Sequence, residues 1–146
     1  MKKIKRARNR PRSAPAKRRM EYRLRITPQV NDGEQKHTTR FLLETTQQFA
    51  SFKYEIAVKE TAEGNKIRYK ILGLKAPKLS LPASGPAHFR REYENLNGPF
   101  EIIVEGLDGN ANSFSVKISP TQIHLLKEPR KKFVQLVIDK SPLTTN

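Results

Sequence analysis

Apolar and polar residues alternate along most of this chain, and this alternation constrains the fold more than any other feature of the sequence. In residues 21–27, the side chains of Tyr22, Leu24 and Ile26 share one face, and charged side chains share the other. A period of two is typical of a β-strand with one buried face, whereas a helix needs apolar residues three and four apart. No long helical periodicity occurs in the 146 residues. The sequence therefore predicts an all-β protein.

Two pairs of alternating segments are predicted to form hairpins. The pairs are residues 53–59 with 67–71, and residues 100–105 with 113–118. Gly64 and Asn65 lie in the first connection, and Asp108 and Gly109 lie in the second. These residue types suit tight hairpin turns because they tolerate positive φ angles. The pattern predicts both hairpins but leaves the register of the first one open.

Three more segments extend the predicted sheet. Residues 122–126 and 132–138 are expected to form short strands, and the second is apolar on both faces, which is typical of a central or covered strand. Residues 38–52 allow either a strand over 40–46 or a short helix over 42–49. Paired threonines in this segment favour the strand, because β-branched residues are enriched in sheets.

Glycines and prolines interrupt residues 73–87 and leave room there only for a short edge strand at residues 78–81. The total is seven to nine short strands, which favours a β-sandwich over its alternative, an OB-like barrel. We expect three parts in the chain: a basic extension over residues 1–19, a sandwich domain over residues 20–140 and a C-terminal tail over residues 141–146.

A local resemblance bears on the sandwich. Residues 93–104 read YENLNGPFEIIV, an Asp-Gly turn follows at Asp108, and residues 113–118 read SFSVKI. This run resembles the last two strands of bacterial immunoglobulin-like modules, in which a leucine, a glycine and an aromatic residue precede the penultimate strand. The resemblance implies an immunoglobulin-like β-sandwich. The cysteines and tryptophan of the family's core have no counterpart, because the chain contains neither residue.

Positive charge is concentrated at the N-terminus. The chain has 29 Lys and Arg residues against 14 Asp and Glu residues, a net charge of +15. Residues 1–19 contain ten of these cations and no acid: Lys2, Lys3, Lys5, Arg6, Arg8, Arg10, Arg12, Lys17, Arg18 and Arg19. We expect this segment to remain extended or disordered until a polyanion neutralises it, because it has almost no apolar side chains to bury. The pattern indicates a nucleic-acid-binding arm, with a transit peptide and a solubilising tail as alternatives.

Further cations occur in the predicted domain. They form three groups: Lys66, Arg68 and Lys70; Lys75, Lys78, His88, Arg90 and Arg91; and Arg130, Lys131 and Lys132. We predict that Arg90, Arg91 and the Arg130 to Lys132 run contact RNA phosphates, with the last group ranked first. Five aromatic residues fall on apolar strand faces and are expected in the core: Tyr22, Tyr54, Tyr69, Phe100 and Phe114. Their placement argues against a protein that binds single strands by base stacking.

The sequence offers little for catalysis. There is no cysteine, and the three histidines, His37, His88 and His124, are far apart in the chain, so we predict no metal site. A Gly-x-Ser-x-Gly nucleophile motif and a glycine-rich phosphate loop are both absent. We therefore expect no enzyme activity, no cofactor and no small-molecule substrate. No apolar run is long enough for a membrane-spanning helix, and a membrane partner is not expected.

A small globular body with a basic extension resembles ribosomal proteins as a class. That resemblance implies a cytoplasmic, non-catalytic structural protein that binds rRNA and contacts neighbouring ribosomal proteins. Two alternatives use the same residues differently. One is an immunoglobulin-like protein-interaction module with a targeting or solubilising tail, and the other is an architectural DNA-binding protein.

Overall fold

The computed structural model describes residues 20–31, 36–50, 53–76, 84–139 and 143–145. The predicted basic arm, the predicted edge strand at 78–81 and Lys78 lie outside these residues. The described residues form ten β-strands and no helix. The strands are β1 (Tyr22–Asn31), β2 (Lys36–Phe49), β3 (Glu55–Glu63), β4 (Lys66–Lys75), β5 (Gly85–Glu94), β6 (Gly98–Glu105), β7 (Ala111–Ile118), β8 (Ile123–Lys127), β9 (Val134–Ile138) and β10 (Leu143–Thr145).

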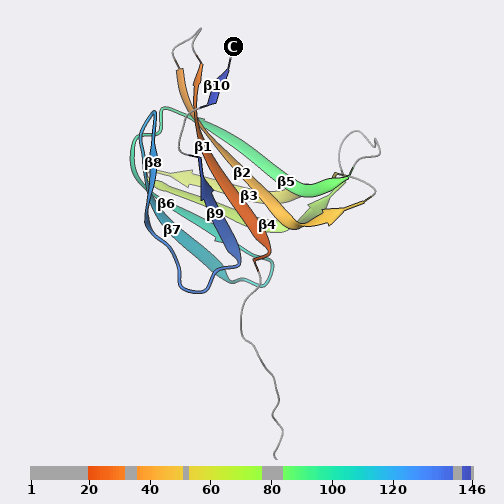
Figure 1. Ribbon diagram of the computed structural model, residues 1–146. Coiled ribbons are helices and arrows are strands. Elements are labelled where there is room, and N and C mark those ends of the chain that lie inside the picture. The colour runs from red at the N-terminus through yellow and green to blue at the C-terminus, as the bar shows by residue number, and fades with distance from the viewer. Residues whose placement is uncertain (1–19, 32–35, 51–52, 77–83, 140–142, 146) are drawn as a thin grey trace, which may run out of the picture.

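All ten strands belong to one mixed sheet that curls until its two halves face each other (Figure 1). Strands β1, β2, β5, β9 and β10 form one half, and β3, β4, β6, β7 and β8 form the other. The halves are joined by a single parallel register pair, Glu55 with His88, where the His88 backbone N–H donates to the Tyr54 carbonyl at 3.2 Å. The predicted all-β fold is confirmed, in a form between a sandwich and a barrel.

The inward positions of the alternating strands make one core between the halves. Leu24 and Phe41 from one half and Tyr69, Phe114 and Val116 from the other have no exposed surface. Each such side chain contributes roughly 1.5–3 kcal/mol by leaving water. The aromatic residues expected in the core lie there: Tyr22, Tyr69 and Phe114 are buried, and Tyr54 and Phe100 pack against the buried cluster.

The hairpins predicted from sequence are the β3–β4 and β6–β7 pairs. Residues 38–49 belong to the long strand β2, as the threonines indicated, and not to a helix. Strand β1 continues through Pro28, although proline cannot donate a backbone hydrogen bond to a neighbouring strand. Pro28 lies between the stretch of β1 that pairs with β9, ending at Ile26, and the stretch that pairs with β10, beginning at Gln29. A residue without an N–H is tolerated at such an interruption of pairing.

Two strands near the ends of the sheet differ from the prediction. β9, expected to be central or covered, pairs only with β1, so its other side is an edge of the described sheet. Its apolar residues after Val134 are half-buried rather than enclosed. β10 lies within the predicted C-terminal tail and pairs in parallel with β1. With β5, for which no strand was predicted, the strand number rises to ten.

Beyond Glu55 and His88, side chains rather than backbone connect β3 with β5. The Tyr93 hydroxyl donates to Glu60 Oε2 and lies 2.9 Å from the Tyr69 hydroxyl. Arg91 Nε donates to the same Glu60 oxygen at 2.9 Å, and the Arg91 guanidinium lies 5.4 Å from the centre of the Tyr93 ring. Burial is the main cause that raises the pKa of both Tyr69 and Tyr93 above the usual 10.0. The network therefore requires both phenols in the protonated form.

The tyrosine network predicts a loss of stability at alkaline pH. Because the folded state raises the pKa of Tyr69 and Tyr93, their contribution is complete below pH 10 and declines as pH rises above 10. The Tyr93→Phe variant should lose about 1–3 kcal/mol at pH 8, since Glu60 and Tyr69 lose a hydrogen-bond partner. Its stability should also fall less steeply with pH. Urea unfolding between pH 8 and 11 measures both effects.

The control for this prediction is Phe41→Leu, which weakens the same aromatic cluster without removing an ionisable group. It should lower stability and leave the alkaline slope unchanged. An equal slope for wild type and Tyr93→Phe would contradict the assigned role of the phenols.

Candidate nucleic-acid interface

Arg90 and Arg91, predicted as one patch, lie on opposite faces of β5. Both guanidinium groups already contact carboxylates: Arg91 contacts Glu60 at 2.9 Å, and Arg90 contacts Glu92 at 3.0 Å. Hydrogen bonding to Glu60 raises the pKa of Arg91. About half of each side chain is exposed, so contact with a phosphate is possible only in competition with a glutamate. The structure thus divides this predicted group.

Part of the same group does come together where the two halves of the sheet join. Lys75, His88 and Arg90 line a polar hollow of about 220 Å³, together with Glu55. Lys75 Nζ lies 3.5 Å from Glu55 Oε1, which balances part of the positive charge. A buried nitrogen of His88, Nδ1, has no hydrogen-bond partner among the described residues. The hollow is a weak anion site because each of its two permanent cations has a glutamate beside it.

The cations on the outer face of the β3–β4 hairpin are also largely balanced. Arg68 contacts Glu105 at 2.7 Å, and Lys66 lies 3.7 Å from Glu101 across the β4–β6 pairing. A hydrogen bond from Ser113 lowers the pKa of Glu101 and so maintains its negative charge. Register places each glutamate near a cation on the next strand, so these contacts follow directly from sheet pairing.

The loop between β8 and β9 is different. Lys132 contacts Glu128 at 2.7 Å, but Arg130 and Lys131 are exposed, and within the described part of the chain no carboxylate lies within ion-pair distance of either. The predicted run of three cations thus contains two that are available to an anionic partner. We refer to Arg130 and Lys131 as the loop cations.

Asn112, on β7, fixes the shape of this loop. Its side-chain oxygen accepts hydrogen bonds from the backbone N–H groups of Phe133 at 2.9 Å and Val134 at 3.1 Å. Its side-chain nitrogen donates to the Lys131 carbonyl at 3.0 Å. Asn112 is only 3% exposed, so these bonds form where water does not compete for them.

Sequence reasoning missed Asn112, although a signal was present. Asn112, Phe114, Val116 and Ile118 occupy the inward positions of β7, and Asn112 is the one polar residue among these four. A polar residue at an inward position must find hydrogen-bond partners, and here it finds them in the loop that carries the predicted RNA contacts. An inward asparagine in an alternating strand therefore indicates a bridge to another segment.

The first described residues of the chain are hydrogen-bonded to the end of the same loop. The backbone N–H groups of Glu21 and Tyr22 donate to the Phe133 carbonyl at 2.8 and 3.1 Å. Met20, the first described residue, is consequently at the end of the molecule where the β8–β9 loop leads into β9 (Figure 1). The attachment point of residues 1–19 and the loop cations are thus neighbours.

Other kinds of site find little support in the described part of the chain. No group of three or more histidine, aspartate or glutamate side chains there could hold a metal ion. None of its segments is a helix long and apolar enough to cross a membrane. The described aromatic rings belong to the core cluster or pack against it, so bases have no exposed stacking platform there.

Removing the Asn112 carboxamide should release the loop. In Asn112→Ala, the Phe133 and Val134 N–H groups lose their acceptor, so we expect a loss of roughly 1–3 kcal/mol. Hydrogen exchange of these two amides should accelerate more than exchange in the β3–β4 hairpin. Asn97→Ala, at an exposed position, is the matched control and should change neither quantity. Unchanged protection of both amides in Asn112→Ala would contradict this role.

Comparison with known proteins adds no assignment to this interface. No family model, no curated protein and no solved structure matches the chain. Its function is therefore inferred from its own residues and their geometry.

Proposed function

We propose that this protein is a non-catalytic, RNA-binding structural component of a cytoplasmic ribonucleoprotein particle, with rRNA of the ribosome as its partner. Residues 1–19 form the arm that neutralises phosphates. The β-domain sets where the arm meets the RNA, and the loop cations add contacts beside its attachment point. Neighbouring ribosomal proteins complete the surroundings of the domain.

The observation that carries this proposal is the position of Met20, to which the acid-free arm is attached, relative to the loop cations. Ten cations without one carboxylate precede Met20, and the chain enters β1 through hydrogen bonds to Phe133, two residues from Lys131. The attachment point of the arm and the loop cations therefore lie at the same end of the domain. Several cations elsewhere on the described surface, among them Arg68, Arg90 and Arg91, contact glutamates, whereas the loop cations do not, and this favours a polyanion at their end of the domain.

RNA suits this arrangement better than duplex DNA. The described residues contain no helix, the element that most often reads the major groove of DNA. Lysine and arginine in an extended arm recognise phosphates without regard to base sequence. Folded RNA presents closely spaced phosphates in narrow grooves that an extended arm can enter. Shape and charge, rather than sequence, therefore determine the partner.

The salt dependence of RNA binding tests the proposal. If six of the ten arm cations each neutralise one phosphate, log affinity should fall against log salt with a slope of about −4 to −5. Deleting residues 2–19 should remove most of the affinity and leave thermal unfolding nearly unchanged. The double variant Arg130→Gln/Lys131→Gln should reduce the slope by about 1 to 2, because two phosphate contacts are lost. A fluorescent rRNA hairpin titrated at several salt concentrations provides the measurement.

The matched control removes two cations that already contact glutamates, Lys66→Gln/Arg68→Gln. It carries the same net charge as the loop variant and should alter the slope less. A slope near zero for the intact protein, or full affinity after deletion of the arm, would reject the proposal. Crosslinking in cells then separates the alternatives: recovery of DNA indicates an architectural DNA-binding protein, and recovery of protein alone indicates an interaction module.

A further inference from the structure

The sheet is left open between β8 and β9. These strands follow one another in the chain and run in opposite directions, yet they share no backbone pairing in the part of the chain that the structure describes. β8 pairs with β7 on one side, and β9 pairs with β1 on one side. Each strand therefore has one edge without a backbone partner among the described residues. We refer to the space between them as the seam.

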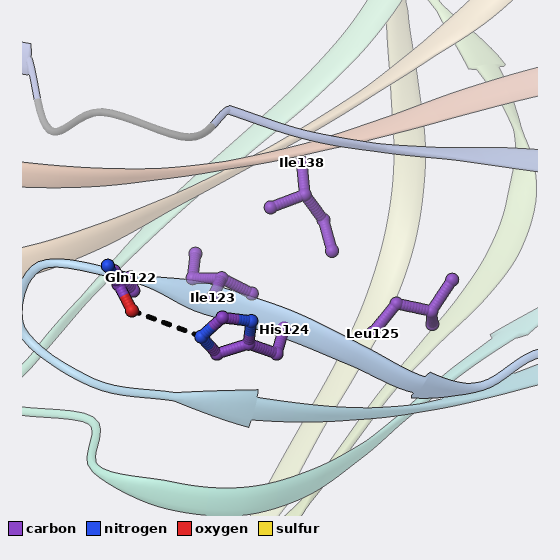
Figure 2. Close-up of a pocket in the computed structure, with 5 residues that line it drawn as sticks. All are labelled: Gln122, Ile123, His124, Leu125 and Ile138. Carbon is purple, nitrogen blue, oxygen red and sulfur yellow. Dashed lines mark hydrogen bonds between the residues drawn. The ribbon is translucent and has the colours of Figure 1, made fainter.

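The seam contains an apolar hollow of about 310 Å³. Ile123 and Leu125 from β8 and Ile138 from β9 line it, with Gln122 and His124 hydrogen-bonded at its rim (Figure 2). Leu125 is in register with Val116, which is fully buried, so Leu125 also occupies an inward position. Nevertheless Leu125 is 39% exposed. This inward leucine is exposed because none of the strands that the structure describes covers it on the seam side.

The edge position of β9 leads to the same conclusion. Its residues Leu136, Val137 and Ile138 are apolar, and each is half-buried in the described structure. In the described sheet β9 has a neighbouring strand on one side only. One additional strand in the seam would cover Leu136 and Ile138, pair the free edges of β8 and β9, and close the sheet.

The charge around the seam restricts what that strand can be. Lys117 and Lys127 lie on the outer side of the β7–β8 pair, and no described carboxylate is within ion-pair distance of them. The loop cations follow immediately after β8. A second copy of this chain would bring its own charge of +15 and be repelled. A nucleic acid has no alternating N–H and C=O groups with which to continue a sheet.

We propose that the seam binds an extended segment of a partner protein, in which apolar residues alternate with acidic ones. The segment adds as one strand between β8 and β9. Its apolar side chains enter the hollow beside Leu125 and Ile138, and its acidic side chains face outward toward Lys117 and Lys127. This inference is independent of the RNA-binding proposal, because it uses the backbone edges and the apolar hollow rather than the arm.

A displayed library of random nine-residue segments, selected on the full-length protein, tests the proposal. The enriched peptides should alternate apolar and acidic residues. The tightest of them should protect backbone amides of β8 and β9 from hydrogen exchange, and β3–β4 amides should be unaffected. The same peptide N-methylated at every second residue, in either phase, should bind at least tenfold more weakly because one set of sheet hydrogen bonds is lost while the side chains remain.

Variants of the protein locate the binding site. Leu125→Lys places a charge in the hollow and should weaken the peptide at least tenfold. Leu74→Lys is the matched control, since Leu74 is an exposed leucine, at 47%, on a different strand. It should change peptide affinity by less than twofold. The N-methylated peptides are measured on the wild-type protein, so they test strand addition even if Leu125→Lys folds poorly.

Four results would overturn the proposal. The first is a library that yields no binder, the second is a selected peptide that leaves the β8 and β9 amides unprotected, and the third is N-methylation that does not weaken binding. The fourth is protection of those amides without peptide, either by dimerisation or by the rRNA hairpin. Leu125→Lys should retain the salt slope of wild-type RNA binding, so failure of the strand-addition site and failure of RNA binding are distinguished by separate measurements.

Discussion

The Asn112 carboxamide accepts two backbone hydrogen bonds from the start of β9 and donates one to the loop before it. The two halves of the sheet need this bond because, at the seam, β8 and β9 do not pair. On the opposite side one backbone pair and the Tyr93–Glu60 contact connect the halves. Asn112 thereby fixes one end of the domain. The loop cations, the attachment point of the arm at Met20 and the start of β9 all lie at this end.

Sheet register determines which cations are available to a partner. Where strands pair in register, glutamate on one strand meets lysine or arginine on the next, and these surface ion pairs individually contribute little to stability. Their larger effect is to lower the positive potential over the sheet faces. Arg130 and Lys131, in the β8–β9 loop, have no paired strand opposite them, so their charge is not balanced in this way. The number of lysine and arginine residues alone therefore overestimates how many cations are available to an anionic partner.

The alternation of side chains was sufficient to predict the two hairpins, the first strand and most of the core, because burial of one sheet face requires it. It could not predict β5, where the charged and half-exposed Arg91 lies on the same face as Phe89 and Tyr93 and contacts Glu60. The strand that pairs with β9 could not be predicted either, since a strand that is apolar on both faces is compatible with several places in a sheet. Long-range contacts, such as those of Asn112 with the β8–β9 loop, depend on how the two halves of the sheet are arranged. A local sequence pattern carries no information about that arrangement.

The way the chain enters the domain has a mechanical consequence. β1 lies between β2 and β9, with hydrogen bonds on both sides. Only Met20 and Glu21 separate residues 1–19 from Tyr22, the first residue of β1 that pairs with both neighbours. If a large particle holds the arm, tension is applied along the axis of β1. The bonds to both neighbours are then loaded together in shear, instead of being opened one after another from a free end. The position of β1 makes the domain resistant to being pulled from its arm.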